Sequence, residues 1–272
     1  MQNTFPPLIL NDWRTTRDTL QRYSQLLGKL RRALAPAHPH WWHITLHVDA
    51  TGLTTTPIPT DTPFELRLNL HAHTLEFLPA DSSAHSLPLE NQSASSLSEW
   101  TLRQLATIGV VPKIDRAPFN SAEILPYDAE HAATFFIALK NIDRVFRQFK
   151  NELPGETSPV QIFPHHFDLS LVWFTGRQVV VPEGEEGGAE QVGFGFSTGD
   201  AGIPEAYFYA TPWLVPAGLT DTPLPKGAYW HTTGWTGGLL PYRTVSESTQ
   251  PAVLLLDFLR TVQQNSAKLM LD

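Results

Sequence analysis

Large apolar residues alternate with smaller or polar ones through residues 164–176, which read PHHFDLSLVWFTG. The large side chains occupy every second position from Phe167 to Trp173. This period of two predicts a β-strand with one face in a hydrophobic core. The opposite face begins with His166 and Asp168, so it carries an imidazole and a carboxylate.

The same reasoning predicts several further strands and four helices. We expect strands at 40–49, 64–71, 75–78, 192–196 and 205–212, and helices with apolar stripes at 12–34, 98–108, 128–150 and 251–264. Strands joined by short connections pair antiparallel. The sequence therefore predicts an α+β protein with antiparallel sheets and flanking helices.

Two parts of the chain show the same order of elements. Each begins with a long amphipathic helix, continues with strands of which the first ends in Thr-Gly, and closes with a helix. We interpret this as a duplication of an α-β-β-β(β)-α unit. The predicted halves are 1–114 and 115–272, packed as one compact unit, with a ligand site in the cleft between them.

Composition narrows the functional classes. The net charge is −8, and the one dense basic cluster, Lys29, Arg31 and Arg32, lies at a helix end. We interpret it as complementing the helix dipole and not as a nucleic-acid patch, so nucleic-acid binding is not expected. No run approaches the roughly 18 apolar residues of a membrane span, and the N-terminus lacks the pattern of a secretory signal. The chain has no Cys, which excludes disulfides and thiolate ligands. We expect a cytoplasmic protein, and the sequence leaves its oligomeric state and any cofactor open.

Several long strings resemble an uncharacterised bacterial family of unknown function. The strings that carry the resemblance are His40–Pro59, Phe64–Leu66, Asp143–Phe149, Phe167–Leu169 and Phe174–Arg177. The match runs nearly from end to end, but it implies no established activity, cofactor or partner.

The resemblance also ranks the candidate residues. The family varies at the positions of His43 and His166, which implies that histidine chemistry there would be peculiar to this member. Asp168 and Arg177 match the family pattern better, and Glu190 falls in a recurrent segment that leads into a glycine-rich run.

A metal site is one reading of the 11 histidines. Side chains two apart on a strand lie about 6.6 Å from each other on one face, which suits shared coordination. His166 and Asp168 are the best local pair, and Glu190 or His231 would complete the set. The alternative is that these are ordinary polar strand residues.

Acid–base chemistry is a second reading, with Asp168, His166 and Glu190 as catalytic candidates. The alternative is that Asp168 pairs with an arginine, Arg177 or Arg144, and ties a helix to the sheet. No nucleophile elbow of the form G-x-S-x-G is present.

The favoured reading is a small-molecule-binding protein with an aromatic-lined pocket. The run from Gly193 to Gly199 lacks the Lys-Ser/Thr of a phosphate-binding loop, so we interpret it as a strand whose glycines let a ring or a backbone approach closely. The expected ligand-binding residues are Arg177, Tyr207, Tyr209, Trp230 and Trp235. Two alternatives remain: a metal-dependent hydrolase or oxygenase, and a structural or protein-interaction module. Whether the acidic loop 183–190 acts as a lid is also open.

Overall fold

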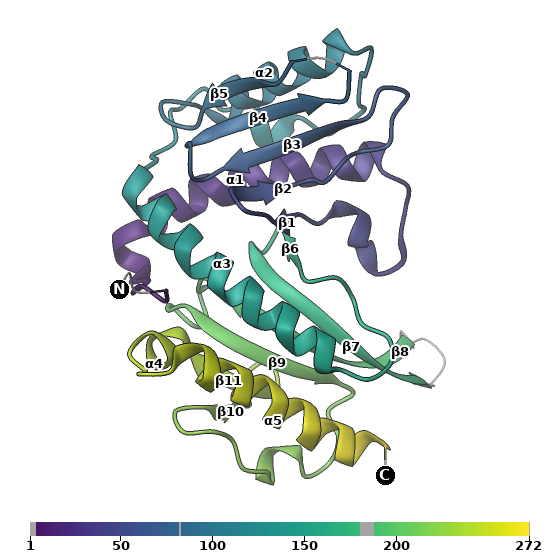
Figure 1. The fold of residues 1–272 in the computed structure, drawn as a ribbon, viewed down its shortest axis with the longest axis vertical. Coiled ribbons are helices and arrows are strands. Elements are labelled where there is room, and N and C mark those ends of the chain that lie inside the picture. The colour runs from purple at the N-terminus through teal and green to yellow at the C-terminus, as the bar shows by residue number, and fades with distance from the viewer. Residues whose placement is uncertain (1–3, 82, 180–187, 272) are drawn as a thin grey trace. The chain divides into compact units, whose positions relative to one another are not determined.

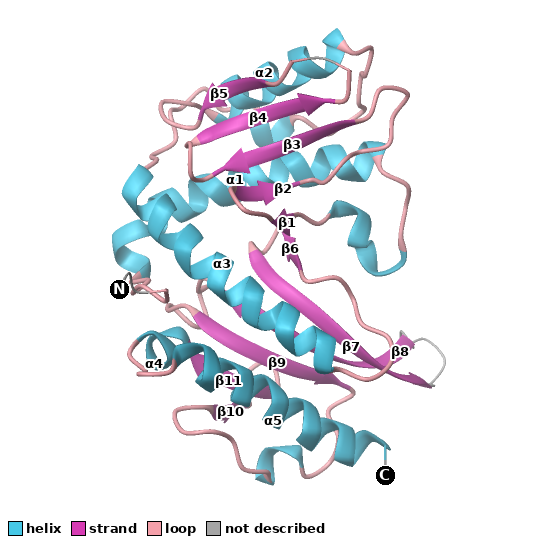
Figure 2. Ribbon diagram, in the orientation of Figure 1, coloured by secondary structure: helices cyan, strands magenta, loops and turns pink. Residues whose placement is uncertain are grey.

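The computed structural model of the protein describes residues 4–81, 83–179 and 188–271. Antiparallel sheets with flanking helices make up the structure, which confirms the predicted α+β class (Figure 1, Figure 2). The chain divides into two compact units. We call Asn11–Lys140 with Gln161–Phe167 the β1–β5 unit. The β7–β11 unit comprises Asn141–Val160, Asp168–Asp272 and the N-terminal residues up to Leu10.

The sheet of the β1–β5 unit is a meander in which each strand pairs antiparallel with the next. Its strands are β1 (His47–Val48), β2 (Gly52–Thr54), β3 (Phe64–Asn69), β4 (Thr74–Pro79) and β5 (His85–Pro88). Alternation in β3 buries Leu66 and Leu68 and leaves Glu65 and Arg67 on the other face. Helix α1 (Leu10–Leu34) runs behind this sheet in Figure 1 and buries its leucines there.

The strand predicted over residues 40–49 is wrong for most of its length. Pro39–Ile44 form a 3₁₀ helix, η1, in which His40 and Trp41 have left-handed backbone angles. The rings of His38 and Trp42 stack with centroids 4.8 Å apart. Residues four apart on a strand are separated by about 13 Å, so an extended chain cannot make this contact. The two rings can stack because the chain is folded into a compact turn here. Of the predicted strand, His47–Val48 are the part that pairs as β1.

The sheet of the β7–β11 unit has strands in the order β10-β11-β9-β8-β7, all antiparallel. Its strands are β7 (Asp168–Val179), β8 (Gly188–Ser197), β9 (Tyr207–Trp213), β10 (Tyr229–His231) and β11 (Gly237–Pro241). Helix α5 (Pro251–Leu271) covers one face, because a Cβ at Gly238 would meet Val262 and Phe258. The residue pairs that share this helix-covered face include Leu169–Phe196 and Leu171–Phe194.

The central strand begins later than its sequence pattern suggests. Residues 164–167 form a turn, closed by a hydrogen bond from the Phe167 amide to the Phe163 carbonyl (2.8 Å), and Phe167 has a φ of 58°. Pro164 has no backbone N–H, so the strand hydrogen bonding cannot continue through it. The strand starts at Asp168, so His166 lies in the turn and the predicted strand-face pair with Asp168 does not form.

The remaining elements complete the order of the chain. They are α2 (Ala94–Thr107), η2 (Ala117–Phe119), α3 (Ala129–Glu152), β6 (Gln161–Phe163), η3 (Leu219–Asp221) and α4 (Tyr242–Ser246). A helix, a run of antiparallel strands and a closing helix occur twice along the chain, as the duplication requires. The duplication itself and the halves 1–114 and 115–272 stay predictions. Every helix in the described residues is too short or too polar to cross a membrane.

Candidate functional site

A short hydrogen bond joins two of the predicted site residues in the β7–β11 unit. The Tyr209 hydroxyl of β9 donates to Oδ2 of Asp168, at the start of β7, over 2.5 Å. The two strands are not neighbours, because β8 lies between them. The Tyr209 side chain therefore reaches across a strand on the face opposite α5.

A glycine in β8 makes this crossing possible. Gly195 pairs with Ser170 of β7 on one side and with Tyr209 on the other. A Cβ at this position would overlap the Cζ and hydroxyl atoms of the Tyr209 ring. This confirms the prediction that the glycine-rich run is a strand that lets a ring approach closely.

A second tyrosine lies beside the first. The rings of Tyr207 and Tyr209 have centroids 6.2 Å apart, and the Tyr207 hydroxyl donates to Oδ2 of Asp200 over 2.7 Å. Oδ1 of Asp200 accepts the amides of Gly202 and Ile203, which orients the carboxylate toward the tyrosine. We call Asp168, Ser170, Asp200, Tyr207 and Tyr209 the Tyr209 network.

Burial sets the protonation of both phenols. It is the main cause that raises the pKa of Tyr209 well above its ordinary value, and the charge of Asp168 and the hydrogen bond to it add to the effect. The pKa of Tyr207 is also raised, by burial first and by the hydrogen bond to Asp200 next. At neutral pH both hydroxyls are neutral donors, so they can bind and orient a partner but cannot act as bases.

The other predicted aromatic residues separate into two places. The rings of Trp235 and His231 lie 4.4 Å apart, and His231 pairs with Gly237 at the β10–β11 edge. Trp230 pairs with Gly238, whose face is covered by α5, and its indole donates to the Thr222 carbonyl (2.8 Å). Trp230 therefore has a structural contact and does not share the face of Tyr209.

Arg177 and Glu190 have local structural partners. Arg177 donates from Nη1 to the Met270 carbonyl (2.5 Å) and from Nη2 to the Leu271 carbonyl (2.8 Å), so it caps the end of α5. Glu190 accepts a hydrogen bond from the Thr175 hydroxyl over 2.6 Å. Most of the acidic loop 183–190, whose role as a lid the sequence leaves open, lies outside the described residues.

Within residues 4–81, 83–179 and 188–271, no three His, Asp or Glu side chains are grouped closely enough to hold a metal ion. The ligand set His166, Asp168 and His231, or the same pair with Glu190, is accordingly not assembled in the described part of the chain. The ring of His166 instead lies against that of His165 in the turn, with centroids 4.3 Å apart.

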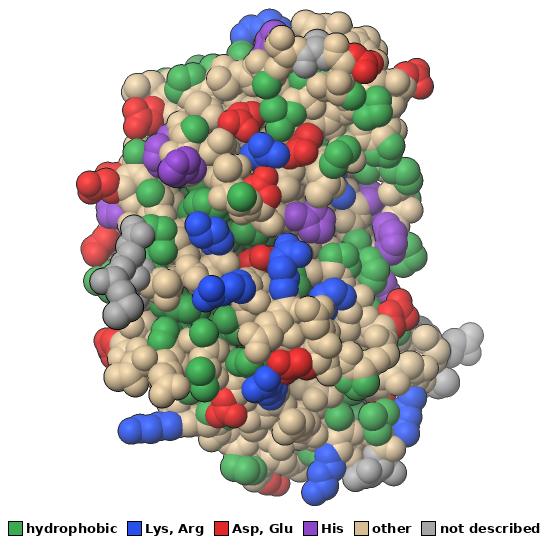
Figure 3. Space-filling view, viewed as in Figure 1, with side chains coloured by type: hydrophobic (Ala, Val, Ile, Leu, Met, Phe, Trp, Pro, Cys, Tyr) green, Lys and Arg blue, Asp and Glu red, His purple; other side chains and the backbone are tan. Residues whose placement is uncertain are grey.

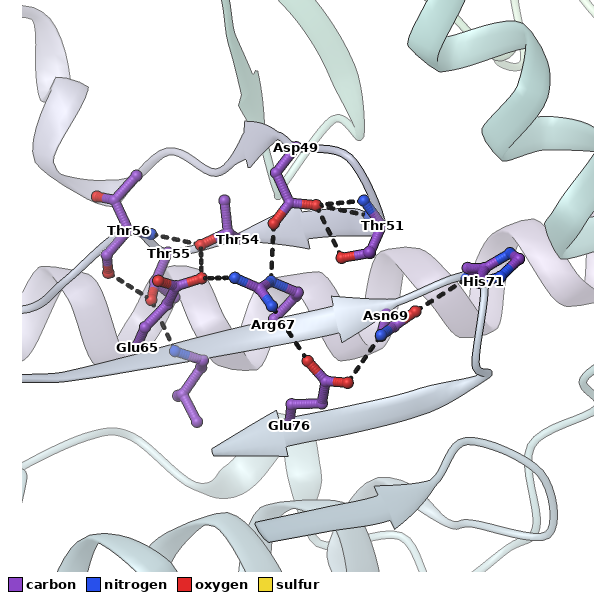
Figure 4. Close-up of polar contacts among 12 residues, drawn as sticks. Asp49, Thr51, Thr54, Thr55, Thr56, Glu65, Arg67, Asn69, His71 and Glu76 are labelled. Atoms are coloured by element: carbon purple, nitrogen blue, oxygen red, sulfur yellow. Dashed lines mark hydrogen bonds and ion pairs between the residues drawn. The ribbon is translucent and has the colours of Figure 1, made fainter. Parts of the chain in front are cut away.

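A second polar group occupies the open face of the β1–β5 sheet (Figure 4). Arg67 of β3 contacts Oδ2 of Asp49 (2.7 Å), Oε1 of Glu65 (2.7 Å) and Oε2 of Glu76 (3.3 Å). In Figure 3 acidic side chains surround a basic one over this sheet. We call these four residues the Arg67 cluster.

Most oxygens of the Arg67 cluster have further partners in the backbone or in neighbouring side chains. Oδ1 of Asp49 accepts the amides of Thr51 and Gly52, and Oε1 of Glu76 accepts from Asn69. Burial by itself lowers the pKa of Arg67, but the charges of the three carboxylates outweigh it and the pKa is raised. The cluster joins β2, β3, β4 and the turn after β1 into one network.

Sequence reasoning missed the Arg67 cluster, although its signal is present. Glu65, Arg67 and Asn69 alternate on the polar face of a strand that was predicted, and Glu76 pairs with Arg67 in the next strand. Assuming that the 64–71 and 75–78 strands form a hairpin would have placed opposite charges across from each other. Asp49 has no comparable signal, because it reaches the cluster through a turn.

Comparisons with known proteins give one result at the level of the whole chain. Neither the curated proteins nor the solved structures yield a significant match. A family of unknown function, DUF5996, matches residues 5–271, which covers both units. The chain therefore belongs to the DUF5996 family, as the resemblance of its long motifs to an uncharacterised family implies.

Proposed function

We propose that this protein binds a small polar organic molecule on the open face of the β7–β11 sheet, with the Tyr209 network as its recognition group. The observation that carries the proposal is the 2.5 Å hydrogen bond from Tyr209 to Asp168, made across Gly195. The cytoplasmic location predicted from the sequence is part of this proposal.

The placement of polar groups supports a recognition role. Ser170 and Tyr207 are 7% and 6% exposed, Asp168 and Tyr209 are half-buried, and Asp200 is exposed, so the network runs from buried polar groups out to solvent. Burial of polar groups costs free energy unless they are hydrogen-bonded, and a strand face could be filled by apolar residues instead. Perturbed pKa values and convergent hydroxyl and carboxylate groups are features of binding sites.

The chemistry of the network limits the ligand. Asp168 and Asp200 supply acceptors, and the phenol oxygens accept as well as donate. A hydroxyl- or amine-bearing molecule therefore fits this face better than an anion. Trp235 and His231 offer a ring pair at the β10–β11 edge of the same sheet.

The test is a ligand screen on matched variants. Wild type, Asp168→Asn, Tyr209→Phe and Tyr242→Phe would be screened by thermal shift against a panel of hydroxylated and amine-bearing metabolites. Tyr242 is the control, because its buried hydroxyl donates to the Pro6 carbonyl (2.8 Å) and its ring packs on Phe196 and Phe208 of the helix-covered face. We expect a compound that stabilises wild type and Tyr242→Phe and has at least tenfold weaker affinity for the other two. Equal affinity for all four proteins would refute the site.

The interaction-module alternative has an observation in its favour. Leu214 and Val215, which follow β9, are 53% and 42% exposed, and Tyr229 of β10 is 47% exposed. Exposed apolar residues in one segment are typical of a partner surface when they form a patch. Light scattering of wild type and a Leu214→Ser, Val215→Ser double variant would test it, and a mass that is monomeric and equal for both would count against self-association.

A further inference from the structure

One buried arginine in the β1–β5 unit donates its hydrogen bonds to neutral groups among the described residues. Arg31, in the last turn of α1, is 9% exposed. Its Nε donates to the His43 carbonyl over 3.0 Å, and its Nη1 donates to the Thr56 hydroxyl over 3.1 Å. A guanidinium carries five N–H donors, and these two bonds use two of them. No buried nitrogen of Arg31 lacks a partner, so any donor left over is on a solvent-accessible nitrogen.

The charge of Arg31 also lacks a counterion in the described part of the chain. None of the ion pairs among residues 4–81, 83–179 and 188–271 includes Arg31. Burial lowers the pKa of its guanidinium, but an arginine stays protonated at neutral pH. The C-terminal end of α1 favours a cation, because the helix dipole is negative there. This gives Arg31 a structural role that requires no ligand.

One neutral partner of Arg31 has strained backbone, and the other lies in a turn that contains strained residues. Thr56 has a φ of 56°, and the η1 turn that presents the His43 carbonyl contains His40 and Trp41 with φ of 58° and 60°. Residues with a Cβ avoid this left-handed region, and such residues cluster at ligand clamps and active sites. Structural capping of a helix does not require strained residues on two separate segments.

The turn is held in shape by contacts of its own. The His38 amide donates to Nδ1 of His43 over 3.1 Å, which closes the turn around η1. Arg32, the next residue of α1, places its guanidinium 5.1 Å from the centroid of the Trp41 ring, and that ring is 54% exposed. A second cation and an exposed ring therefore lie at the η1 turn, whose His43 carbonyl accepts from Arg31.

The carboxylates of the Arg67 cluster are bonded elsewhere. Thr56 connects toward them, because its amide donates to Oγ1 of Thr54, which donates to Oε1 of Glu65 (Figure 4). Glu65 is in turn ion-paired with Arg67. The cluster therefore fixes the position of Thr56 without neutralising Arg31.

We infer that Arg31 is the centre of an anion-binding site that takes a carboxylate or phosphate group of a small molecule. The guanidinium donates to two oxygens of the anion, as arginine does in bidentate recognition. Thr56 and the His43 carbonyl hold the guanidinium in place, and Arg32 adds attraction at the exposed side. This site lies within the β1–β5 unit and does not depend on the function proposed for the Tyr209 network.

The test uses the intact protein with two simple probes. Binding of sodium phosphate and sodium succinate would be measured by equilibrium dialysis and by thermal shift, at an ionic strength held constant with sodium chloride. We expect saturable binding of about one anion per chain for at least one probe. A response to phosphate alone identifies a phosphorylated ligand class, and a response to succinate alone identifies a carboxylic acid.

Variants locate the site. Arg31→Gln is expected to abolish saturable binding, and Arg31→Lys to weaken it about tenfold because the planar fork is lost. Arg32→Gln should weaken it by about threefold. Arg22→Gln is the matched control, because Arg22 lies on the same helix and donates to a neutral carbonyl, that of Pro118 (3.2 Å).

Two outcomes would overturn the inference. One is the absence of saturable binding of both probes to wild type, which does not depend on whether any variant folds. The other is equal stabilisation of wild type, Arg31→Lys and Arg22→Gln by phosphate, since excluded salts stabilise folded proteins in general.

Discussion

Each unit presents one open sheet face with carboxylates on it, and the two faces use them differently. In the β1–β5 unit three carboxylates surround Arg67, and the four side chains are between 19% and 26% exposed. In the β7–β11 unit Asp168 and Asp200 each accept a hydrogen bond from a phenol. The first arrangement gathers three carboxylates around one shared cation, whereas the second places neutral phenol donors against carboxylates.

This difference separates a stabilising network from the surface that we propose for recognition. Hydrogen bonds from Arg67 and Asn69 to Glu65 and Glu76 tie the strands together. The polar groups of the Arg67 cluster therefore bond to one another. The Tyr209 network consists of hydroxyls that keep acceptor capacity after donating, and it depends on a glycine in the strand between its members. Polar residues on a sheet face therefore need to be judged by their partners and not by their number.

The largest expected effect comes from filling the space over which Tyr209 crosses β8. Gly195→Ala should cost about 3 kcal/mol in the free energy of unfolding, because the new methyl group overlaps the Tyr209 ring and displaces it. Gly188→Ala is the control in the same strand, since a Cβ there meets only Trp213 carbons at 3.6 Å. Urea denaturation would measure both, and similar values for the two variants would mean that the ring does not need the glycine.

The second-largest loss of stability is expected from replacing Arg67, the cation that the three carboxylates of the β1–β5 sheet share. Arg67→Met should cost about 2 kcal/mol, because three carboxylates then repel one another with only partial solvation. Adding Glu65→Gln and Glu76→Gln should restore most of this loss. If the triple variant is as unstable as the single one, repulsion among the carboxylates is not the cause of the loss.

Deleting the phenol hydroxyl of Tyr209 should have a smaller effect. Tyr209→Phe is expected to cost about 1.5 kcal/mol, since a hydrogen bond to a charged acceptor is lost. Tyr242→Phe, which loses a bond to a neutral carbonyl, should cost about 1 kcal/mol. Chemical denaturation at pH 7 compares the two, and a clearly larger loss for Tyr242→Phe would contradict the role of charge at Asp168.

Alkaline pH should resolve the smallest difference. The folded pKa of Tyr209 lies above its unfolded value of about 10, so the folded state retains a proton that the unfolded state releases. The stability contributed by this group is complete below pH 10 and is lost as the pH rises further. Tyr209→Phe should therefore flatten the fall of unfolding free energy between pH 10 and 11. An unchanged slope would show that this phenol ionises equally in both states.

Sequence patterns predicted the fold where one physical rule decided the outcome. Alternation identified the 64–71 strand, and the apolar stripe identified the helix that became α3. The prediction failed at residues 40–49, where stacked rings and left-handed angles replaced a strand. It also failed at His166, because a closed turn precedes the strand and removes the pairing with Asp168.

The candidate site was predicted in part. Asp168, Tyr207 and Tyr209 were named, and the structure brings Tyr209 onto Asp168. Arg177 and Trp230 were named too, but they bond to backbone carbonyls at α5 and after η3. Residue type alone cannot distinguish a ligand-binding arginine from a capping one, because both use the same donors.

The sequence by itself determined the family, the α+β class and the glycine-rich strand that lets a ring lie flat. These depend on periodicity and side-chain size, which are local properties of the chain. Only the tertiary structure decided that Tyr209 reaches Asp168 across a strand, and that Arg31 is buried with neutral partners. Both depend on strand register and on contacts between residues far apart in the sequence, which local patterns do not encode.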